Sequence, residues 1–250
     1  MIPEIVISHP SLPILGRRFA GSNSGWTALG RFPVSRIYCI GRNYREHAIE
    51  MGHDPDREPP FFFQKPSNAV VDTYGGDGIV PYPPMTSNLH FEGELVVCIG
   101  KEGGGHKPLP LDDVESHIFG YAIGCDLTRR DLQAEAKKLS RPWAVAKGFD
   151  FSAPCGPVVP KDQVSISGAT PLSLKVGGKT RQETTIEKMI WPIPETISYL
   201  SKYFRLMPGD LIMTGTPAGV GAIEINDEVT ITCGELPPCK FTVKSPLSSA

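Results

Sequence analysis

Short apolar runs separated by glycine and proline recur along the chain, and few stretches have helical spacing. Runs of this length between turn residues are typical of short β-strands. Residues 172–176 alternate in polarity and lead into Gly177-Gly178, which predicts a β-hairpin. Residues 61–66 begin with three phenylalanines, so we expect a strand buried on both faces. Further strands are predicted at residues 37–40, 95–100, 119–126, 211–213, 228–233 and 240–243.

Helical patterns are fewer. Residues 43–51 predict a short helix, with Asn43 as its N-cap and Gly52 as its end. Residues 128–139 and 189–204 predict two longer helices. Several short strands with a few helices predict an α+β fold that is mostly β.

Two segments lack either pattern. Residues 1–33 are interrupted by glycine and proline, and we expect them to be an irregular N-terminal extension packed on a main domain of residues 34–250. Residues 53–60 are polar and rich in proline, so they cannot continue the preceding helix. We expect a loop there, which could serve as a lid.

Two glutamates interrupt the apolar pattern at residues 89–97. If this stretch is extended, Glu92 and Glu94 point to one face, and Phe91 and Leu95 point to the other. Two neighbouring carboxylates repel each other, and a divalent cation is the simplest compensation. The alternative is a strand end with two solvated glutamates, and this fragment alone does not separate the two.

His47 and Glu50 lie three residues apart and share a face of the predicted helix. A carboxylate beside an imidazole can orient it and raise its pKa, which suits a general base. An ordinary surface ion pair is the commoner arrangement for an isolated pair of this kind.

Other polar residues lie where predicted elements end. Asp126 closes a buried strand and could be a ligand, a catalytic acid or the cap of the next helix. Lys65 could point into a cleft or extend to solvent, and Lys147 has apolar neighbours where it could stabilise an oxyanion. The glycine-rich residues 214–221 could bind a carboxylate through backbone N–H groups or form only a turn.

Composition narrows the class of protein. The 250 residues are 40% hydrophobic and carry a formal net charge of −2, which argues against nucleic acid or an acidic membrane as partner. No apolar run approaches the roughly 18 residues of a membrane span, and the first residues lack a secretory pattern. Six cysteines without a CxxC pair predict buried thiols rather than disulfides, with a cytoplasmic location as the default.

Glu92, Glu94 and Asp126 all lie near predicted strand ends, without a His or Cys cluster of metal spacing. Ligation by oxygen alone favours Mg²⁺, Mn²⁺ or Ca²⁺ over zinc. Three carboxylates leave coordination positions for water and substrate, and a 2-oxo acid offers adjacent oxygens that chelate such an ion. We therefore expect a small 2-oxo acid as substrate, if these groups meet in space.

These motifs together resemble the fumarylacetoacetate hydrolase family, and in particular its acylpyruvate-hydrolase-like branch. The resemblance extends from Arg36 to the C-terminus. The matching motifs are Tyr38-Cys39-Ile40-Gly41-Arg42-Asn43-Tyr44 with His47 and Glu50, Phe62-Phe63-Gln64-Lys65-Pro66, Glu92-Gly93-Glu94, Asp126-Leu127-Thr128-Arg129-Arg130-Asp131-Leu132-Gln133, Trp143 with Lys147, and Thr214-Gly215-Thr216-Pro217. One departure is His90-Phe91-Glu92, where relatives often have His-His-Glu.

The resemblance implies a mixed β-sandwich roll or barrel with flanking helices, usually as a homodimer. It implies that Glu92, Glu94 and Asp126 bind Mg²⁺ or Mn²⁺. It also implies that His47 and Glu50 activate water and that Lys147 supports an oxyanion. The substrate contacts that it implies are Arg42, Tyr44, Lys65, Arg130, Gln133 and Thr216.

The activity implied by the resemblance is metal-dependent hydrolysis of a C–C bond in a 3-acylpyruvate. The sequence is most similar to the enzymes that convert fumarylpyruvate to fumarate and pyruvate in gentisate-type degradation of aromatic compounds. Decarboxylation of oxaloacetate and isomerisation or decarboxylation of 2-oxo dienes are alternatives on the same scaffold. A binding protein without catalytic activity is the alternative from another class.

Overall fold

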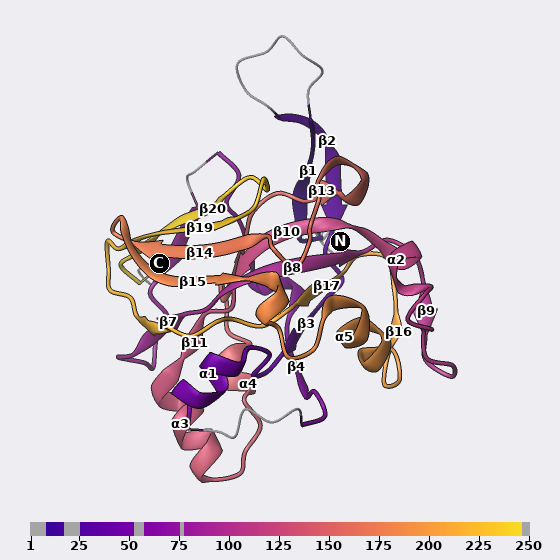
Figure 1. The fold of residues 1–250 in the computed structure, drawn as a ribbon. Coiled ribbons are helices and arrows are strands. Elements are labelled where there is room, and N and C mark those ends of the chain that lie inside the picture. Colours follow the sequence, from indigo (N-terminus) through magenta and orange to yellow (C-terminus); the bar gives the residue numbers. More distant parts are fainter. Residues whose placement is uncertain (1–8, 18–25, 53–57, 76–77, 247–250) are drawn as a thin grey trace, which may run out of the picture.

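The structure is a computed structural model that describes residues 9–17, 26–52, 58–75 and 78–246. Within these residues, the centre is a mixed eight-stranded sheet in the order β4-β3-β17-β8-β10-β12-β5, with β13 paired to β10. The antiparallel pair of β8 and β10 forms its middle. The strands are β3 Arg36–Ile40, β4 Phe62–Lys65, β5 Val70–Asp72, β8 Gly93–Ile99, β10 Ile118–Cys125, β12 Ala153–Cys155, β13 Val159–Pro160 and β17 Asp210–Met213 (Figure 1).

A second sheet has five strands in the described residues, in the order β15-β14-β19-β20-β6. Its strands are β6 Gly78–Pro81, β14 Pro171–Val176, β15 Lys179–Thr185, β19 Glu228–Cys233 and β20 Cys239–Lys244. The remaining strands pair in smaller sheets. They are β1 Ser11–Arg17 with β2 Trp26–Pro33, β11 Thr128–Arg129 with β7 Leu89–Phe91 and β18 Gly221–Ala222, and β9 Gly103–Gly104 with β16 Arg205–Leu206.

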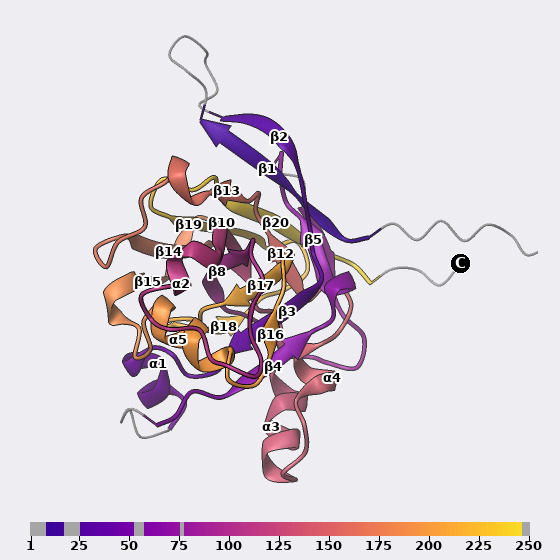
Figure 2. The ribbon, with the colours of Figure 1, turned by 90° about the vertical axis from the view of Figure 1, so that its right-hand side faces the viewer.

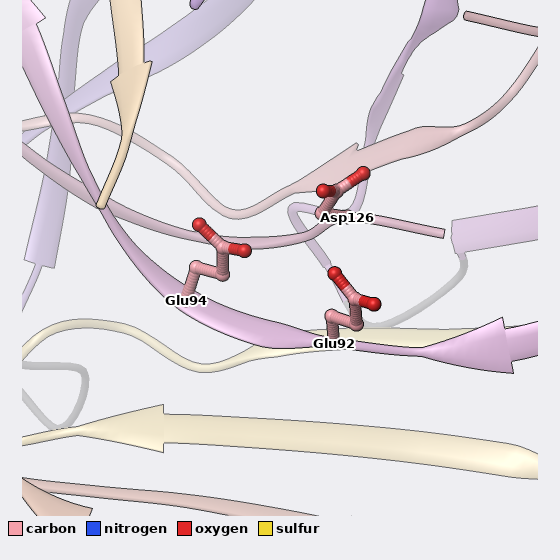
Figure 3. A group of neighbouring side chains, drawn as sticks. All are labelled: Glu92, Glu94 and Asp126. Carbon is pink, nitrogen blue, oxygen red and sulfur yellow. The ribbon is translucent and has the colours of Figure 1, made fainter. Parts of the chain in front are cut away.

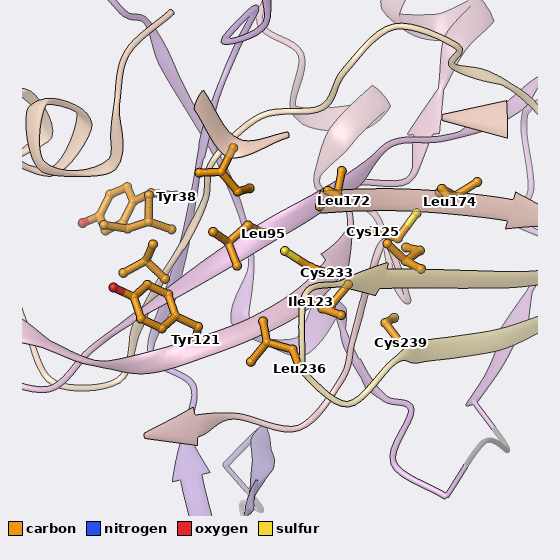
Figure 4. Close-up of a cluster of buried hydrophobic side chains, with 14 of the residues drawn as sticks. Tyr38, Leu95, Tyr121, Ile123, Cys125, Leu172, Leu174, Cys233, Leu236 and Cys239 are labelled. Carbon is orange, nitrogen blue, oxygen red and sulfur yellow. The ribbon is translucent and has the colours of Figure 1, made fainter. Parts of the chain in front are cut away.

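The alternation of side chains along β8 builds two buried clusters. Leu95 faces one side and packs in a cluster with Leu172 and Leu174 of β14, which joins the two large sheets (Figure 4). Val96 faces the other side and belongs to a second cluster that includes Leu12 of β1. This arrangement of two large sheets around a shared core confirms the expected mixed β fold.

The described parts of residues 1–33 are not irregular, so that expectation is wrong. β1 and β2 form an antiparallel hairpin with a bulge between Ile14 and Leu15. The Leu15 N–H donates to the Val158 carbonyl at 2.9 Å, and the Val158 N–H donates to the Pro13 carbonyl at 2.8 Å. Proline and glycine interrupt the strand pattern of these residues, and the backbone contacts that hold the hairpin on the main domain come from Val158, far along the sequence. Residues 1–8 and 18–25 lie outside the described part.

The predicted helices are present, but each is shorter than predicted. They are α1 Arg45–Glu50, α3 Arg130–Lys138 and α5 Ile193–Leu200. In the described residues, two further short helices are α2 Val114–His117 and α4 Ala144–Lys147. Single 3₁₀ turns occur at Ser67–Ala69, Lys161–Gln163 and Ile186–Lys188. Helices α1, α3 and α4 gather at one end of the molecule (Figure 1, Figure 2). No helix in the described ranges is long and apolar enough to cross a membrane.

Two local expectations are wrong. Asn43 does not cap α1, because its side-chain amide donates to the carbonyls of Trp191 and Thr214 at 3.0 and 2.8 Å and so joins distant loops. The strand β4 is an edge strand with Gln64 exposed, so it is not buried on both faces. Gly52 ends the helix as predicted, with a φ of 74° that favours glycine.

All six cysteines are buried and free, which confirms the expectation of thiols rather than disulfides. The predicted lid of residues 53–60 falls mainly on residues 53–57, which lie outside the described part. A lid role for this loop stays a prediction.

Candidate functional site

Three carboxylates meet where β8 begins and β10 ends (Figure 3). Glu92 and Glu94 share a face across Gly93, as the period of two requires, and Asp126 follows β10. The Asp126 N–H donates to the Glu92 carbonyl at 2.8 Å, which joins the two segments. The three side chains offer oxygens within 4.8 Å of one another and are 5%, 2% and 1% exposed. Glu92 and Glu94 are therefore not solvated residues at a strand end.

Cations surround two of the three carboxylates. The Lys147 Nζ lies 2.7 Å from Glu92 Oε2 and 2.6 Å from Asp126 Oδ2. Arg130 Nη2 lies 2.5 Å from Glu92 Oε1, and Lys65 Nζ lies 2.8 Å from Asp126 Oδ1. Burial alone would raise the pKa of Glu92, but the charges of Lys147 and Arg130 outweigh it and hold that pKa below its ordinary value. Burial alone would lower the pKa of Lys147, but Asp126 and Glu92 raise it.

Glu94 differs from its neighbours because it has no cationic partner among the described residues. Its carboxylate accepts a hydrogen bond from the Gly215 N–H at 2.7 Å. Burial raises the pKa of Glu94 well above its ordinary value, and the charges of Asp126 and Glu92 raise it further. Oδ1 of Asp126, although close to Lys65, accepts no well-formed hydrogen bond from the described residues. A buried set of oxygen donors with one uncompensated carboxylate fits a hard divalent cation.

His47 is buried and pairs with the exposed Glu50, which has a further hydrogen-bond donor. His47 Nδ1 lies 3.2 Å from Glu50 Oε2, and the Gly219 N–H donates to Glu50 at 3.0 Å. Because a carboxylate only accepts hydrogen bonds, this contact places the proton on Nδ1 and leaves the Nε2 lone pair of His47 free. The expectation of a raised pKa is wrong: burial lowers the pKa of His47 and outweighs the charges of Glu92 and Glu50. His47 is only 6% exposed although Glu50 is exposed, so the imidazole, unlike that of an ordinary surface ion pair, is shielded from solvent.

These groups open into one cleft. Nine of the residues predicted for the site line it: Arg42, His47, Glu92, Glu94, Asp126, Arg130, Gln133, Lys147 and Thr216. Its remaining walls are mostly apolar and aromatic, formed by Ile40, Gly41, Met51, Phe61, Phe63, Trp143 and Lys137. The cleft therefore combines a charged end with an aromatic wall, as small-molecule sites commonly do.

Three predicted site residues do not line the cleft. Glu50 is exposed and contacts His47 at Nδ1. Lys65 is 2% exposed and donates to the Leu127 carbonyl at 3.0 Å, so it holds Asp126 and its neighbours from behind. Tyr44 is 2% exposed in the main core, and its hydroxyl has no hydrogen-bond partner in the described residues. Substrate contacts at Tyr44 and Lys65 stay predictions.

The glycine-rich loop at residues 214–221 binds carboxylates, but they are the protein's own. Its Gly215 N–H donates to Glu94 and its Gly219 N–H donates to Glu50. Thr216 Oγ1 donates to the Gly93 carbonyl at 3.0 Å, between the two glutamates. The loop thus positions both the acidic cluster and the histidine pair.

Gln182 on β15 is a site residue that sequence reasoning missed. Its Oε1 accepts from the Gly93 N–H at 2.9 Å, and its Nε2 donates to Thr216 Oγ1 and the Pro217 carbonyl, both at 2.8 Å. It is 1% exposed, whereas Arg181 and Glu183 beside it are exposed. Every residue of β15 is polar, so no local pattern marks Gln182, and its partners are far away in sequence.

The comparisons with known proteins agree with this geometry. Residues 36–244 match the family profile described as fumarylacetoacetate (FAA) hydrolase C-terminal. The chain belongs to the fumarylacetoacetate hydrolase family, as the motifs indicated.

Two solved structures and one curated relative show the range of the family. A fumarylpyruvate hydrolase from Pseudomonas aeruginosa, in complex with Mn²⁺ and pyruvate, is 43% identical with a TM-score of 0.83 over 96% of this chain and 99% of its own. A candidate fumarylpyruvate hydrolase from Burkholderia cenocepacia is 46% identical with a TM-score of 0.80 over 96% of each chain. The mitochondrial oxaloacetate tautomerase FAHD1 of Mus musculus is 43% identical over 209 residues, 83% of this chain and 91% of its own.

The chain is therefore a member of an enzyme family that includes hydrolases and tautomerases. Its fold, the acidic cluster and the Mn²⁺ complex of the Pseudomonas aeruginosa protein together point to a divalent metal ion as cofactor. The names of these relatives specify different substrates, so membership of the family does not by itself identify the substrate of this chain.

Proposed function

We propose that this protein hydrolyses the C–C bond of a 3-acylpyruvate, with fumarylpyruvate giving fumarate and pyruvate. The observation that carries the proposal is that the acidic cluster, Lys147 and His47 line one cleft. Such a cleft holds the groups that hydrolysis needs: a site for a 2-oxo acid, a base for water and a cation for the developing oxyanion. The relative that binds Mn²⁺ and pyruvate, one of the two products, supports it.

Glu92, Glu94 and Asp126 would hold Mg²⁺ or Mn²⁺, and the same oxygen donors are compatible with Ca²⁺. When bound, the ion would polarise the 2-oxo acid oxygens and favour the enolate form of the departing pyruvate. Lys65 and Arg130 keep the carboxylates of Asp126 and Glu92 in place for this task.

His47 would take the proton from water. Its Nδ1–H is held by Glu50, so its free Nε2 is the basic atom available to the cleft. Its lowered pKa keeps the imidazole neutral, and therefore able to accept a proton, at neutral pH. The resulting hydroxide adds to the carbonyl of the acyl group.

Lys147 would stabilise the negative charge that develops on the attacked carbonyl oxygen. Its raised pKa keeps it protonated, so it acts as a fixed positive charge rather than as a base. The C–C bond then breaks, its electron pair passes to the pyruvate enolate, and the acyl group leaves as fumarate. Arg42, Arg130, Gln133 and Thr216 line the same cleft and would contact the substrate.

The direct test mixes the purified protein with fumarylpyruvate in Mg²⁺ or Mn²⁺ and then in excess EDTA. The proposal expects metal-dependent loss of the enol absorbance, with equal amounts of fumarate and pyruvate. Lys175→Met, an exposed change on β14, is a matched control and should keep full activity. Absence of both products in the presence of either metal would reject the proposal.

Oxaloacetate is the second candidate substrate, because the mouse tautomerase is as identical to this chain as the Pseudomonas aeruginosa hydrolase, at 43%. Enol-to-keto conversion without loss of carbon would identify a tautomerase, and release of CO₂ would identify a decarboxylase. Comparing kcat/KM for oxaloacetate and fumarylpyruvate in one preparation separates these activities.

We also propose, from the family resemblance, that residues 34–250 form the catalytic domain, preceded by residues 1–33, and that the protein is a cytoplasmic homodimer that contributes to aromatic-compound breakdown. Sedimentation equilibrium tests the dimer: a mass of about 27.2 kDa at micromolar concentration would show a monomer instead.

A further inference from the structure

The positive charges that line the cleft fall into two groups. Lys147 and Arg130 each contact a carboxylate of the acidic cluster at 2.7 Å or less. Arg42 and Lys137 do not. The only acidic contact recorded for Arg42 among the described residues is Glu58, at 3.8 Å, and Lys137 forms no ion pair within that part of the chain. Among the described residues, these two cations therefore lack the close counter-charge that the first pair has.

Both side chains are held in the cleft wall rather than extended into solvent. The guanidinium of Arg42 lies 5.0 Å from the ring centre of Phe61, and its Nε is buried without a hydrogen-bond partner in the described residues. The Lys137 amine lies 5.3 Å from the ring centre of Trp143. Cation–π contacts of this kind orient a cation without neutralising it. Both charges thus stay available to an anion in the cleft.

The electrostatic repulsion between the cations at this part of the cleft favours binding of an anion. Partial burial lowers the pKa of Lys137, and the charges of Arg130 and Arg42 lower it further. Arg42 also has a φ of 55°, a backbone conformation that non-glycine residues seldom adopt. Strained residues of this kind occur where surrounding structure requires one side chain in one place. A bound carboxylate would relieve the repulsion between these cations.

We propose that Arg42 and Lys137 form a subsite for a second carboxylate, at the end of the substrate's acyl chain. The inference rests on the proposed function and defines its substrate class: acylpyruvates with a carboxylate at each end. The pyruvyl group lies at the acidic cluster, and the distal carboxylate lies at Arg42 and Lys137. Phe61, Phe63 and Trp143 lie in the wall of the same cleft, where flat rings suit a planar unsaturated chain.

Acetylpyruvate provides the matched substrate, because it has the same reacting groups and no distal carboxylate. The wild-type enzyme is expected to prefer fumarylpyruvate. Lys137→Met should lower kcat/KM for fumarylpyruvate about tenfold to a hundredfold, the range of one charge-assisted contact, and leave acetylpyruvate within about twofold. Lys137→Arg keeps the charge and should retain most of the preference. Lys138→Met changes the exposed neighbour and should alter neither substrate.

A binding measurement separates failure of the subsite from failure of the proposed activity. Calorimetry compares fumarate with crotonate, a planar acid of the same length with one carboxylate. The proposal expects wild-type protein to bind fumarate more tightly and Lys137→Met to lose that preference, even if neither acylpyruvate is turned over. Equal loss for both acylpyruvates would show a general structural role for Lys137. That result, or equal binding of fumarate and crotonate by wild-type protein, overturns the subsite.

Discussion

The ammonium of Lys147 lies 2.6 Å from Oδ2 of Asp126, and both side chains are almost completely buried. The charge of Asp126 raises the pKa of Lys147, so this lysine stays protonated although it is buried. The same ammonium reaches Glu92 at 2.7 Å, so one lysine compensates two carboxylates of the acidic cluster.

Lys147→Met should therefore slow catalysis and leave Glu92 and Asp126 without the ammonium that they share. We expect kcat to fall about a hundredfold to a thousandfold, the usual cost of losing one stabiliser of an oxyanion. Loss of one partner of a buried pair should also lower the free energy of unfolding by roughly 3–5 kcal/mol in metal-free protein. Steady-state kinetics and urea unfolding measure the two effects. Unchanged kcat would remove Lys147 from the mechanism.

Glu94→Gln should have the opposite effect on stability. It replaces a buried carboxyl group that has no cationic partner among the described residues, and it keeps an oxygen that can accept from the Gly215 N–H. We expect metal-free protein to be as stable as the wild type or more stable. The apparent affinity for Mn²⁺ should fall at least tenfold, because the ion loses an anionic ligand. Thermal unfolding with increasing Mn²⁺ measures both, and an unchanged Mn²⁺ response would exclude Glu94 as a ligand.

The pH dependence should follow His47. Activity requires its neutral form, and burial lowers its pKa from the ordinary value of 6.5. Activity should therefore be retained at neutral pH and decline only when the pH falls below about 6.5. Glu50→Gln removes a charge that raises the pKa of His47, so the acid limb should move to still lower pH while kcat decreases. A profile of kcat/KM against pH checks this, and an acid limb that Glu50→Gln leaves in place would contradict it.

Gln182→Leu should separate positioning from chemistry. The change leaves the Gly93 N–H without its acceptor and Thr216 without a donor, at a cost of roughly 1–3 kcal/mol in unfolding free energy. Because Gly93 lies between two proposed ligands, Mn²⁺ affinity should fall as well. Gln182→Glu puts an acceptor in place of the donating Nε2, which faces the Pro217 carbonyl and Thr216, so it should not rescue binding. Glu183→Gln, exposed on the same strand, is the control. Normal Mn²⁺ binding in Gln182→Leu would restrict this residue to a structural role.

Local pattern was enough to predict the acidic cluster. A strand places Glu92 and Glu94 on one face by its period of two, and the apolar run before Asp126 indicates a strand end. The strands β3, β10, β17 and β19 were predicted for the same reason.

Contacts between distant segments were not predictable in this way. Gln182 meets Gly93 across 89 positions, and Asn43 meets Trp191 across 148. The hairpin of β1 and β2 is stabilised by Val158, which no pattern near the N-terminus reveals. The pKa of His47 was expected to rise because the sequence indicates its partner Glu50 but not the depth of its burial.

Whether water adds to the acyl carbonyl in this cleft can be measured with an oxygen isotope. Fumarylpyruvate is turned over in H₂¹⁸O with Mn²⁺, and the released fumarate is analysed by mass spectrometry. A carboxylate does not exchange its oxygens with water at neutral pH on this timescale, whereas the keto oxygen of pyruvate does. We expect ¹⁸O from water in the carboxyl group of fumarate that forms from the acyl carbonyl, and we expect His47→Asn to release labelled fumarate much more slowly than the wild type. Enzyme-dependent consumption of fumarylpyruvate without labelled fumarate would contradict this expectation.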